Sequence, residues 1–133
     1  MNLWGTGPFD NDTGQAFIQE ALQDGAYALQ EAFDVVLDPD MDWIEAEEGW
    51  RVLAAAEVLR AVLKGDTSRL VDAGLRAWVQ DVNADELAPL QTSARHAVKR
   101  VLGSESELPD LWEDEADAQA WRTGAEQLLA ALS

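Results

Sequence analysis

The sequence predicts an all-α fold: a compact bundle of about five helices, preceded by an ordered N-terminal segment of aromatic and acidic residues. Apolar residues recur at helical spacing along most of the chain, and helix-capping patterns and glycines separate these stretches. No stretch has the convincing apolar–polar alternation of a β-strand. With 133 residues, 47% of them hydrophobic, the chain has the size and composition of one domain, residues 1–133, around one core.

The first helix is predicted to begin at Asp12. An acid followed three residues later by Gln15 is a capping-box pattern, in which the two side chains bond backbone N–H groups of the first turn. The apolar stripe that follows, from Phe17 to Phe33, keeps helical spacing throughout. We therefore expect one helix over this stretch.

The second helix is predicted to start at a similar pattern, Asp42 with Glu45, and to run to about Lys64. Gly65 then fits a left-handed helix terminator. This helix is apolar on nearly all sides, which is typical of a central helix buried by its neighbours. Because Glu57 lies within it, we expect its carboxylate to be at least half buried.

Three further helices complete the predicted bundle. The third covers about 69–82, with Val71 on its apolar side. Asn83 begins another capping pattern, and the fourth helix then runs to Leu102. The last helix is predicted to begin near Asp114, and its apolar stripe predicts contact with the core.

Charge is the strongest signal of the composition. The formal net charge is −17, and it is uneven: residues 1–50 hold twelve acids with no Lys or Arg, whereas residues 51–102 hold six acids and eight Lys or Arg. Such a field repels phosphate backbones and anionic membranes, so we expect neither nucleic acid nor membrane as a partner. It attracts a basic protein or a divalent cation, although solubility alone also explains acidic surfaces.

Composition excludes several other classes of protein. The chain has no cysteine, which excludes disulfides, thiolate zinc sites and thiol nucleophiles. No basic stretch followed by an apolar run begins the sequence, and no apolar run reaches the ~20 residues of a membrane span. We therefore expect a cytoplasmic protein.

The opening stretch WGTGPFDND, residues 4–12, is rich in residues that restrict or bend the backbone. We expect Trp4 and Phe9 to dock on the bundle, because each ring can bury a large apolar area. Asp10 and Asn11 can bond local backbone groups in turns, and Asp12 is the expected helix cap. The segment is thus predicted to be a structural plug that closes the bundle.

Three stretches together resemble the bacterial domain-of-unknown-function family 4259: the opening motif, an alanine-rich part of the second helix and the SELPDLW stretch near the end. The matching residues are Trp4, Gly5, Gly7, Phe9, Asp10, Asn11 and Asp12, then Ala54 to Glu57, and then Ser106, Glu107, Leu108, Leu111 and Trp112. Trp43 departs from the pattern, since many relatives are expected to have Tyr there. The resemblance implies a small helical domain and no activity, because no catalytic residues are established for the family.

The acidic residues also suggest two sites of another kind. Asp10 and Asp12 could face Glu45 or Glu57 across the core and hold a divalent cation through oxygen ligands. The same carboxylates could act as general acid and base, with the pKa of Glu57 raised by burial, as in a hydrolase. The ordinary alternative is a buried Glu57 paired with Arg60, another Arg or a capping amide.

Residues 38–49, DPDMDWIEAEEG, imitate a calcium-binding loop, since Asp38, Asp40 and Asp42 occupy its first, third and fifth positions. The imitation then fails, because Trp43 replaces the turn glycine and a glycine stands where the bidentate Glu belongs. A non-standard cation site remains an alternative. The candidate metal ligands are Asp10, Asp12, Asp38, Asp40, Asp42, Glu45, Glu47 and Glu57.

Two other groups of residues have predicted places. The basic cluster RHAVKR, residues 95–100, is expected to pair with the acidic first or last helix rather than with phosphate. Of the six tryptophans, three fit helical core positions and three lie at element ends, where an exposed ring could anchor a partner. The first three are Trp50, Trp78 and Trp121, and the second three are Trp4, Trp43 and Trp112.

These observations favour a non-enzymatic domain that acts by protein–protein association. Its partner is expected to be basic or to carry a groove for aromatic side chains. One version of this function is the neutralisation of a basic toxin or nuclease, whose cleft an acidic surface could occupy. The alternatives are a divalent-cation-binding domain and a carboxylate hydrolase, and both require the acidic residues to converge.

Overall fold

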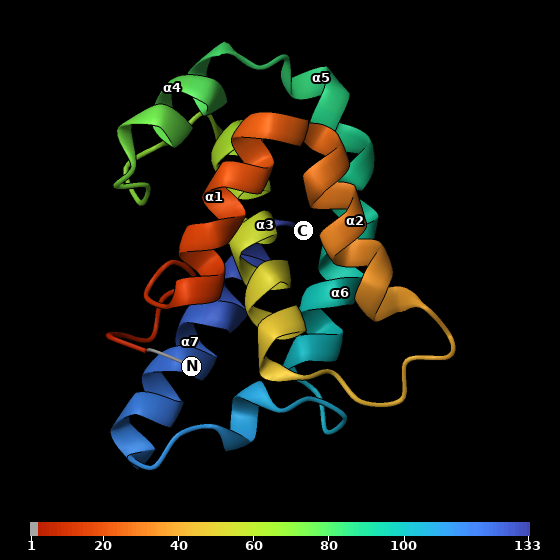
Figure 1. The fold of residues 1–133 in the computed structure, drawn as a ribbon, viewed down its shortest axis with the longest axis vertical. Helices are drawn as coiled ribbons and strands as arrows, with labels where there is room; N and C mark the ends of the chain where they lie inside the picture. The colour runs from red at the N-terminus through yellow and green to blue at the C-terminus, as the bar shows by residue number, and fades with distance from the viewer. Residues whose placement is uncertain (1–2) are drawn as a thin grey trace.

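Helix α3 (Ala46–Lys64) is the centre of the fold in the computed structural model, which describes residues 3–133. Four longer helices surround it, while two shorter ones cover one end of the bundle, as Figure 1 shows. The surrounding helices are α1 (Asp12–Asp24), α2 (Ala26–Leu37), α6 (Gln91–Leu102) and α7 (Glu115–Ala131), and the shorter ones are α4 (Ala73–Asp81) and α5 (Ala84–Leu87). The predicted all-α bundle is confirmed.

Helix α3 is central because its side chains are apolar on all sides. Every residue from 52 to 62 is buried, including Glu57. The helix ends at Gly65, whose φ of 62° is the predicted left-handed terminator. Its predicted start at Asp42 is wrong, because Glu45 is the N-cap and forms a capping box with Glu48. Residues 42–44 instead precede the helix, and Ile44 forms a β-bridge.

The first predicted helix is in fact two helices. Gly25 separates α1 from α2 with a φ of 59°, a conformation that other residues adopt only with strain. The predicted cap is also wrong by one residue: the side chain of Asn11, not Asp12, accepts a hydrogen bond from the N–H of Gly14 at 2.7 Å. Gln15 bonds the carbonyl of Phe9 at 2.9 Å instead of closing a capping box.

Helix α4 is shorter than predicted. Asp72 caps it by accepting from the N–H of Leu75 at 2.8 Å, so residues 69–71 precede the helix and Val71 is almost fully exposed rather than packed. Asn83 caps α5, a 3₁₀ turn (η1, Ala88–Leu90) leads into α6, and Asp114 caps α7. These later caps agree with the sequence.

The described residues form two isolated β-bridges. One joins Leu3 to Asn11, and the other joins Ile44 to Ser106, which precedes the 3₁₀ turn η2 (Leu108–Asp110). No helix formed by residues 3–133 is both long and apolar enough to cross a lipid bilayer.

Candidate functional site

The N-terminal leader, residues 3–11, folds back on itself before α1 begins. The N–H of Trp4 donates to the carbonyl of Asp10 at 2.9 Å, and the Asp10 carboxylate accepts from the N–H of Gly7 at 3.0 Å. A Cβ on Gly5 would lie 2.4 Å from Asp10 Oδ2, so this close approach requires glycine. The leader is thus an ordered loop, as predicted.

Asn11 fastens the leader to α1. Its side chain is fully buried, donates to the carbonyl of Pro8 at 3.2 Å and caps the helix through Gly14. A Cβ on Gly14 would lie 2.0 Å from the Pro8 oxygen, so the leader crosses the first turn in direct contact with the backbone. The NH₂ group of this side-chain amide therefore bonds the leader, and its oxygen bonds the first turn of α1.

The two leader aromatics have different environments. Phe9 is partly buried and packs against the core, as predicted, but Trp4 is 58% exposed, so its predicted docking is wrong. The reason is the bridge between Leu3 and Asn11. Successive side chains of an extended segment point to opposite sides, and Leu3 is the one that packs against the core.

Three hollows border the leader; one lies against residues 111–117, and the other two share part of their lining. The α7-side hollow, of about 210 Å³, lies between the leader, α3 and α7. The α4-side hollow, of about 300 Å³, lies between the leader, α1 and residues 69–75. Gly7, Pro8, Phe9 and Arg69 line both. The leader therefore separates two cavities rather than closing the bundle without gaps.

A buried ion pair borders the α7-side hollow. Glu57, which lines this hollow, is 4% exposed, and Arg60 is 5% exposed. Arg60 Nε lies 2.9 Å from Glu57 Oε2, and a second guanidinium nitrogen lies 3.4 Å from Oε1. Because both carboxylate oxygens accept from Arg60, the pairing expected as the ordinary alternative is confirmed.

Asp66 extends this pair toward the surface. Its Oδ2 lies 3.9 Å from Arg60 Nη1, just beyond the end of α3. The backbone N–H of Ser68 lowers the pKa of Asp66 below its ordinary value, together with the Ser68 side chain and the charges of Arg60 and Arg69. Each cause stabilises the charged carboxylate.

The candidate metal ligands are not brought together. Within residues 3–133, no three His, Asp or Glu side chains form a group that could hold a metal ion. Four of these carboxylates have partners elsewhere: Asp10 accepts from the N–H of Gly7, Asp38 accepts from the N–H of Asp40, Glu45 caps α3, and Glu57 pairs with Arg60. The other four are exposed, namely Asp12 in the first turn of α1, Asp40, Asp42 and Glu47.

Three tryptophans form a cluster beside α3. The rings of Trp50 and Trp112 meet edge to face with centroids 6.1 Å apart, and Trp112 lies 6.4 Å from Trp121. Trp50 and Trp121 are core residues, as predicted, and Trp112 joins them instead of standing out as an anchor. Trp78, the third tryptophan predicted to lie in the core, is only partly buried.

The SEL motif holds the start of α3. Ile44 donates to the carbonyl of Glu105 and accepts from the N–H of Glu107, both at 2.9 Å. The Glu107 carboxylate also accepts from the N–H of Ala46 at 2.7 Å. Sequence reasoning missed this contact, although the unpaired N–H groups at any helix start require acceptors.

The basic cluster does not form its predicted ion pairs. Arg100 donates to the backbone carbonyls of Val36 and Met41, at the end of α2 and in the loop that follows. No ion pair formed by residues 3–133 involves residues 95–100. The last carbonyls of a helix lack partners within it, and Arg100 supplies a donor to one of them, that of Val36.

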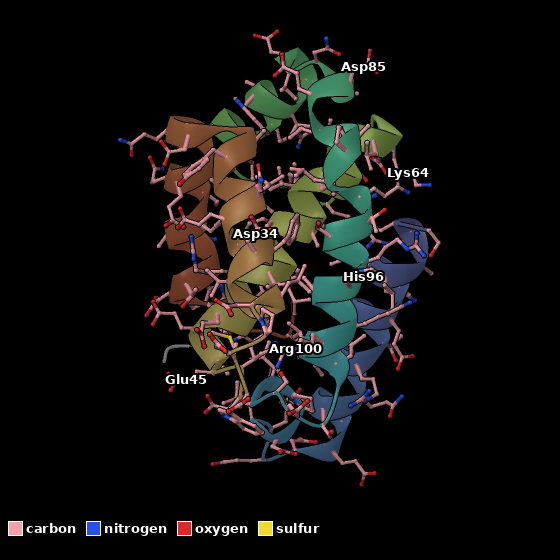
Figure 2. All side chains as sticks on the ribbon, turned by 90° about the vertical axis from the view of Figure 1, so that its right-hand side faces the viewer. Asp34, Glu45, Lys64, Asp85, His96 and Arg100 are labelled. Atoms are coloured by element: carbon pink, nitrogen blue, oxygen red, sulfur yellow. The ribbon has the colours of Figure 1, made fainter. Side chains whose placement is uncertain are left out.

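Acidic side chains cover α1, α2 and the loop that follows. Nine of the twelve acids in residues 1–50 are exposed, and Arg51 of α3 is the cation among them, 3.3 Å from Glu20 and 3.7 Å from Glu31. Figure 2 shows Asp34 on α2 and Glu45 beyond it. Tyr27, on the same helix as Asp34, is 64% exposed.

The fold and these features define a small all-α acidic domain with an ordered leader and a buried ion pair. The chain belongs to the family described as Domain of unknown function (DUF4259), whose model matches residues 2–124. No curated protein and no solved structure matches the chain. The resemblance read from the sequence is therefore confirmed.

Proposed function

We propose that this domain binds a protein partner and that the partner carries a basic surface. The observation that carries the proposal is the exposed acidity of α1, α2 and the following loop, where eight carboxylates face solvent. Such a field steers a cationic partner toward the domain and repels anionic ones. One form of this function is the neutralisation of a basic toxin or nuclease.

The buried charges support a non-enzymatic role. Glu57 lines the α7-side hollow and is almost fully buried, but both of its carboxylate oxygens accept from Arg60. A general base must be able to accept a proton from a substrate within hydrogen-bond reach. The ion pair would have to break before Glu57 could do so.

Affinity capture with the full chain as bait tests the proposal. We expect a basic protein that is retained at low salt and lost as salt rises, because exposed charges are screened within about 10 Å at 0.1 M salt. Recovery of only neutral or acidic proteins, insensitive to salt, would contradict the proposal.

A pair of charge-reversal variants makes the test specific. Asp24→Lys with Asp34→Lys changes the acidic surface of α1 and α2. The matched control, Asp81→Lys with Asp85→Lys, changes the net charge equally at the α4–α5 end, where Figure 2 labels Asp85. We expect the first variant to lose the partner and the control to retain it. Equal loss in both would mean that only net charge matters.

A further inference from the structure

We infer that the partner docks at the α4-side hollow by inserting an apolar side chain that is flanked by basic residues. This inference rests on the proposed function, because it names the surface and the chemistry of the same interaction. It is carried by two exposed apolar side chains, by the apolar floor between them and by the acids at the rim.

Val71 and Trp4 belong to two different segments that line the hollow: residues 69–75 and the leader. Val71 is 95% exposed and Trp4 is 58% exposed, and both line this cavity. Val71 is held outward because Leu70 before it is buried and Asp72 after it caps α4. Large apolar side chains fixed in solvent beside a cavity are typical of protein-binding surfaces.

The floor of the hollow is apolar and formed by ordered elements. Phe9 of the leader, Ile18 of α1, Leu70 and Leu75 line it. The leader and the start of α4 are fixed by the hydrogen bonds of Asp10 and Asp72, so the cavity exists before any partner arrives. Its volume of about 300 Å³ accommodates one large apolar side chain. Preformed cavities reduce the entropy lost on binding.

The rim selects a basic partner. Asp10 and Asp72 each use Oδ2 for a backbone N–H, and no hydrogen bond formed by residues 3–133 uses their Oδ1 atoms. These oxygens can accept from a lysine or arginine. Arg69 is the one cation among the lining residues, within a chain of net charge −17. A second copy of the chain would meet this surface with the same negative field, so self-association here is disfavoured.

The outer face of α2 offers a weaker alternative. Tyr27 is exposed there beside Glu31, Asp34 and Asp38, in a depression whose other lining residues are Gln30 and the half-buried Val35. This depression has no buried apolar floor. We assign to this depression the long-range attraction of the basic partner, whereas the α4-side hollow supplies the contact from which water is excluded.

Peptide binding to the isotopically labelled full chain tests the inference by NMR. The probe is a synthetic peptide with one phenylalanine flanked on both sides by lysines. Control peptides replace the phenylalanine with glycine or the lysines with glutamates. We expect the probe to shift the backbone amide signals of residues 69–75 and of residues 4–10, apart from Pro8, which has no N–H. We expect the glycine peptide to bind at least about fivefold more weakly and the glutamate peptide not to bind.

Exposed substitutions localise the binding without unfolding the chain. We expect Val71→Ser and Trp4→Ala each to raise the Kd of the probe by about fivefold or more. Tyr27→Ala is the matched control and should change it by less than about twofold, since that ring lies outside the hollow. Circular dichroism checks that each variant keeps its helices.

Two results would overturn the inference in distinguishable ways. Shifts confined to α2, reduced by Tyr27→Ala and unchanged by Val71→Ser, would reject the hollow and leave the basic-partner function standing. Absence of binding by every lysine peptide, even at low salt, would reject the basic-partner function as well.

Discussion

The guanidinium of Arg60 lies 2.9 Å from the carboxylate of Glu57, one turn away on α3, and both side chains are almost fully buried. The pair sits within the most apolar helix of the protein and borders the α7-side hollow. Each charge compensates the other, because an unpaired charge removed from water costs several kcal/mol.

Breaking this pair should destabilise the fold strongly. Arg60→Met leaves the Glu57 carboxylate without its partner, and we expect a loss of about 3–5 kcal/mol in the free energy of unfolding. The double variant Arg60→Met with Glu57→Leu should recover much of this loss, because no uncompensated charge remains. Urea denaturation at neutral pH measures both. A double variant no more stable than Arg60→Met would contradict the explanation.

Asp66 should titrate below its ordinary pKa of 3.8. The backbone N–H of Ser68 is the largest cause, so Ser68→Pro should raise the pKa of Asp66 more than Arg69→Gln does. Because the folded-state pKa is lowered, the contribution of Asp66 to stability is complete above the unfolded-state value and is lost as pH falls through the folded-state value. Carboxyl-carbon NMR titration measures the pKa directly, and a value at or above 3.8 would contradict this account.

Gly14→Ala should destabilise the domain. Its Cβ would lie 2.0 Å from the Pro8 carbonyl oxygen, so the leader must move. We expect a net loss of about 1–3 kcal/mol, as for other overpacked sites. Gly124→Ala is the matched control: a Cβ there meets nothing within 4 Å, and the change should stabilise α7 by about 0.5–1 kcal/mol. Thermal melts compare the two, and equal signs would refute the steric argument.

Asn11→Asp should destabilise the fold, although the Asp and Asn side chains have similar shapes. The carboxylate can still cap α1 through Gly14, but it cannot donate to the carbonyl of Pro8, and it places a charge at a fully buried position. We expect a loss of about 1–3 kcal/mol at neutral pH, decreasing as the acid is protonated. Chemical denaturation at two pH values measures it. An Asp variant as stable as the parent chain would show that the Pro8 contact contributes little.

Millimolar Ca²⁺, Mg²⁺ or Mn²⁺ should leave the thermal midpoint unchanged. The candidate carboxylates within residues 3–133 are dispersed, and a cation raises the midpoint only if it binds the folded state selectively. Differential scanning fluorimetry against a chelator control measures this, with Na⁺ at matched ionic strength. A rise specific to one divalent cation would revive the cation-binding alternative.

The parts of the fold that depend on local pattern were predictable from the sequence. The all-round apolar character of α3 indicated its central position, and Arg60 was one of the partners expected for a buried Glu57. The break at Gly25 was missed because the apolar period continues across it, and only its positive φ distinguishes it from a glycine within a helix.

The parts that depend on distant contacts were not predictable. The start of α3 was placed at Asp42, because nothing in the local pattern reveals the bridge between Ile44 and Ser106. The exposure of Trp4 likewise follows from the pairing of Leu3 with Asn11 rather than from the hydrophobicity of the ring. The α7-side and α4-side hollows are formed by segments far apart in the sequence, so the candidate site could be found only in the structure.

The contact between Glu107 and Ala46 spans 61 positions of the chain. Before residues 105–107 leave the ribosome, the first turn of the central helix therefore lacks the acceptor for the N–H of Ala46. Translation has to pass the SEL motif before that turn can be completed, and the apolar helix stays incompletely covered until then. The start of α3 is thus completed only after residues 105–107 have been synthesised.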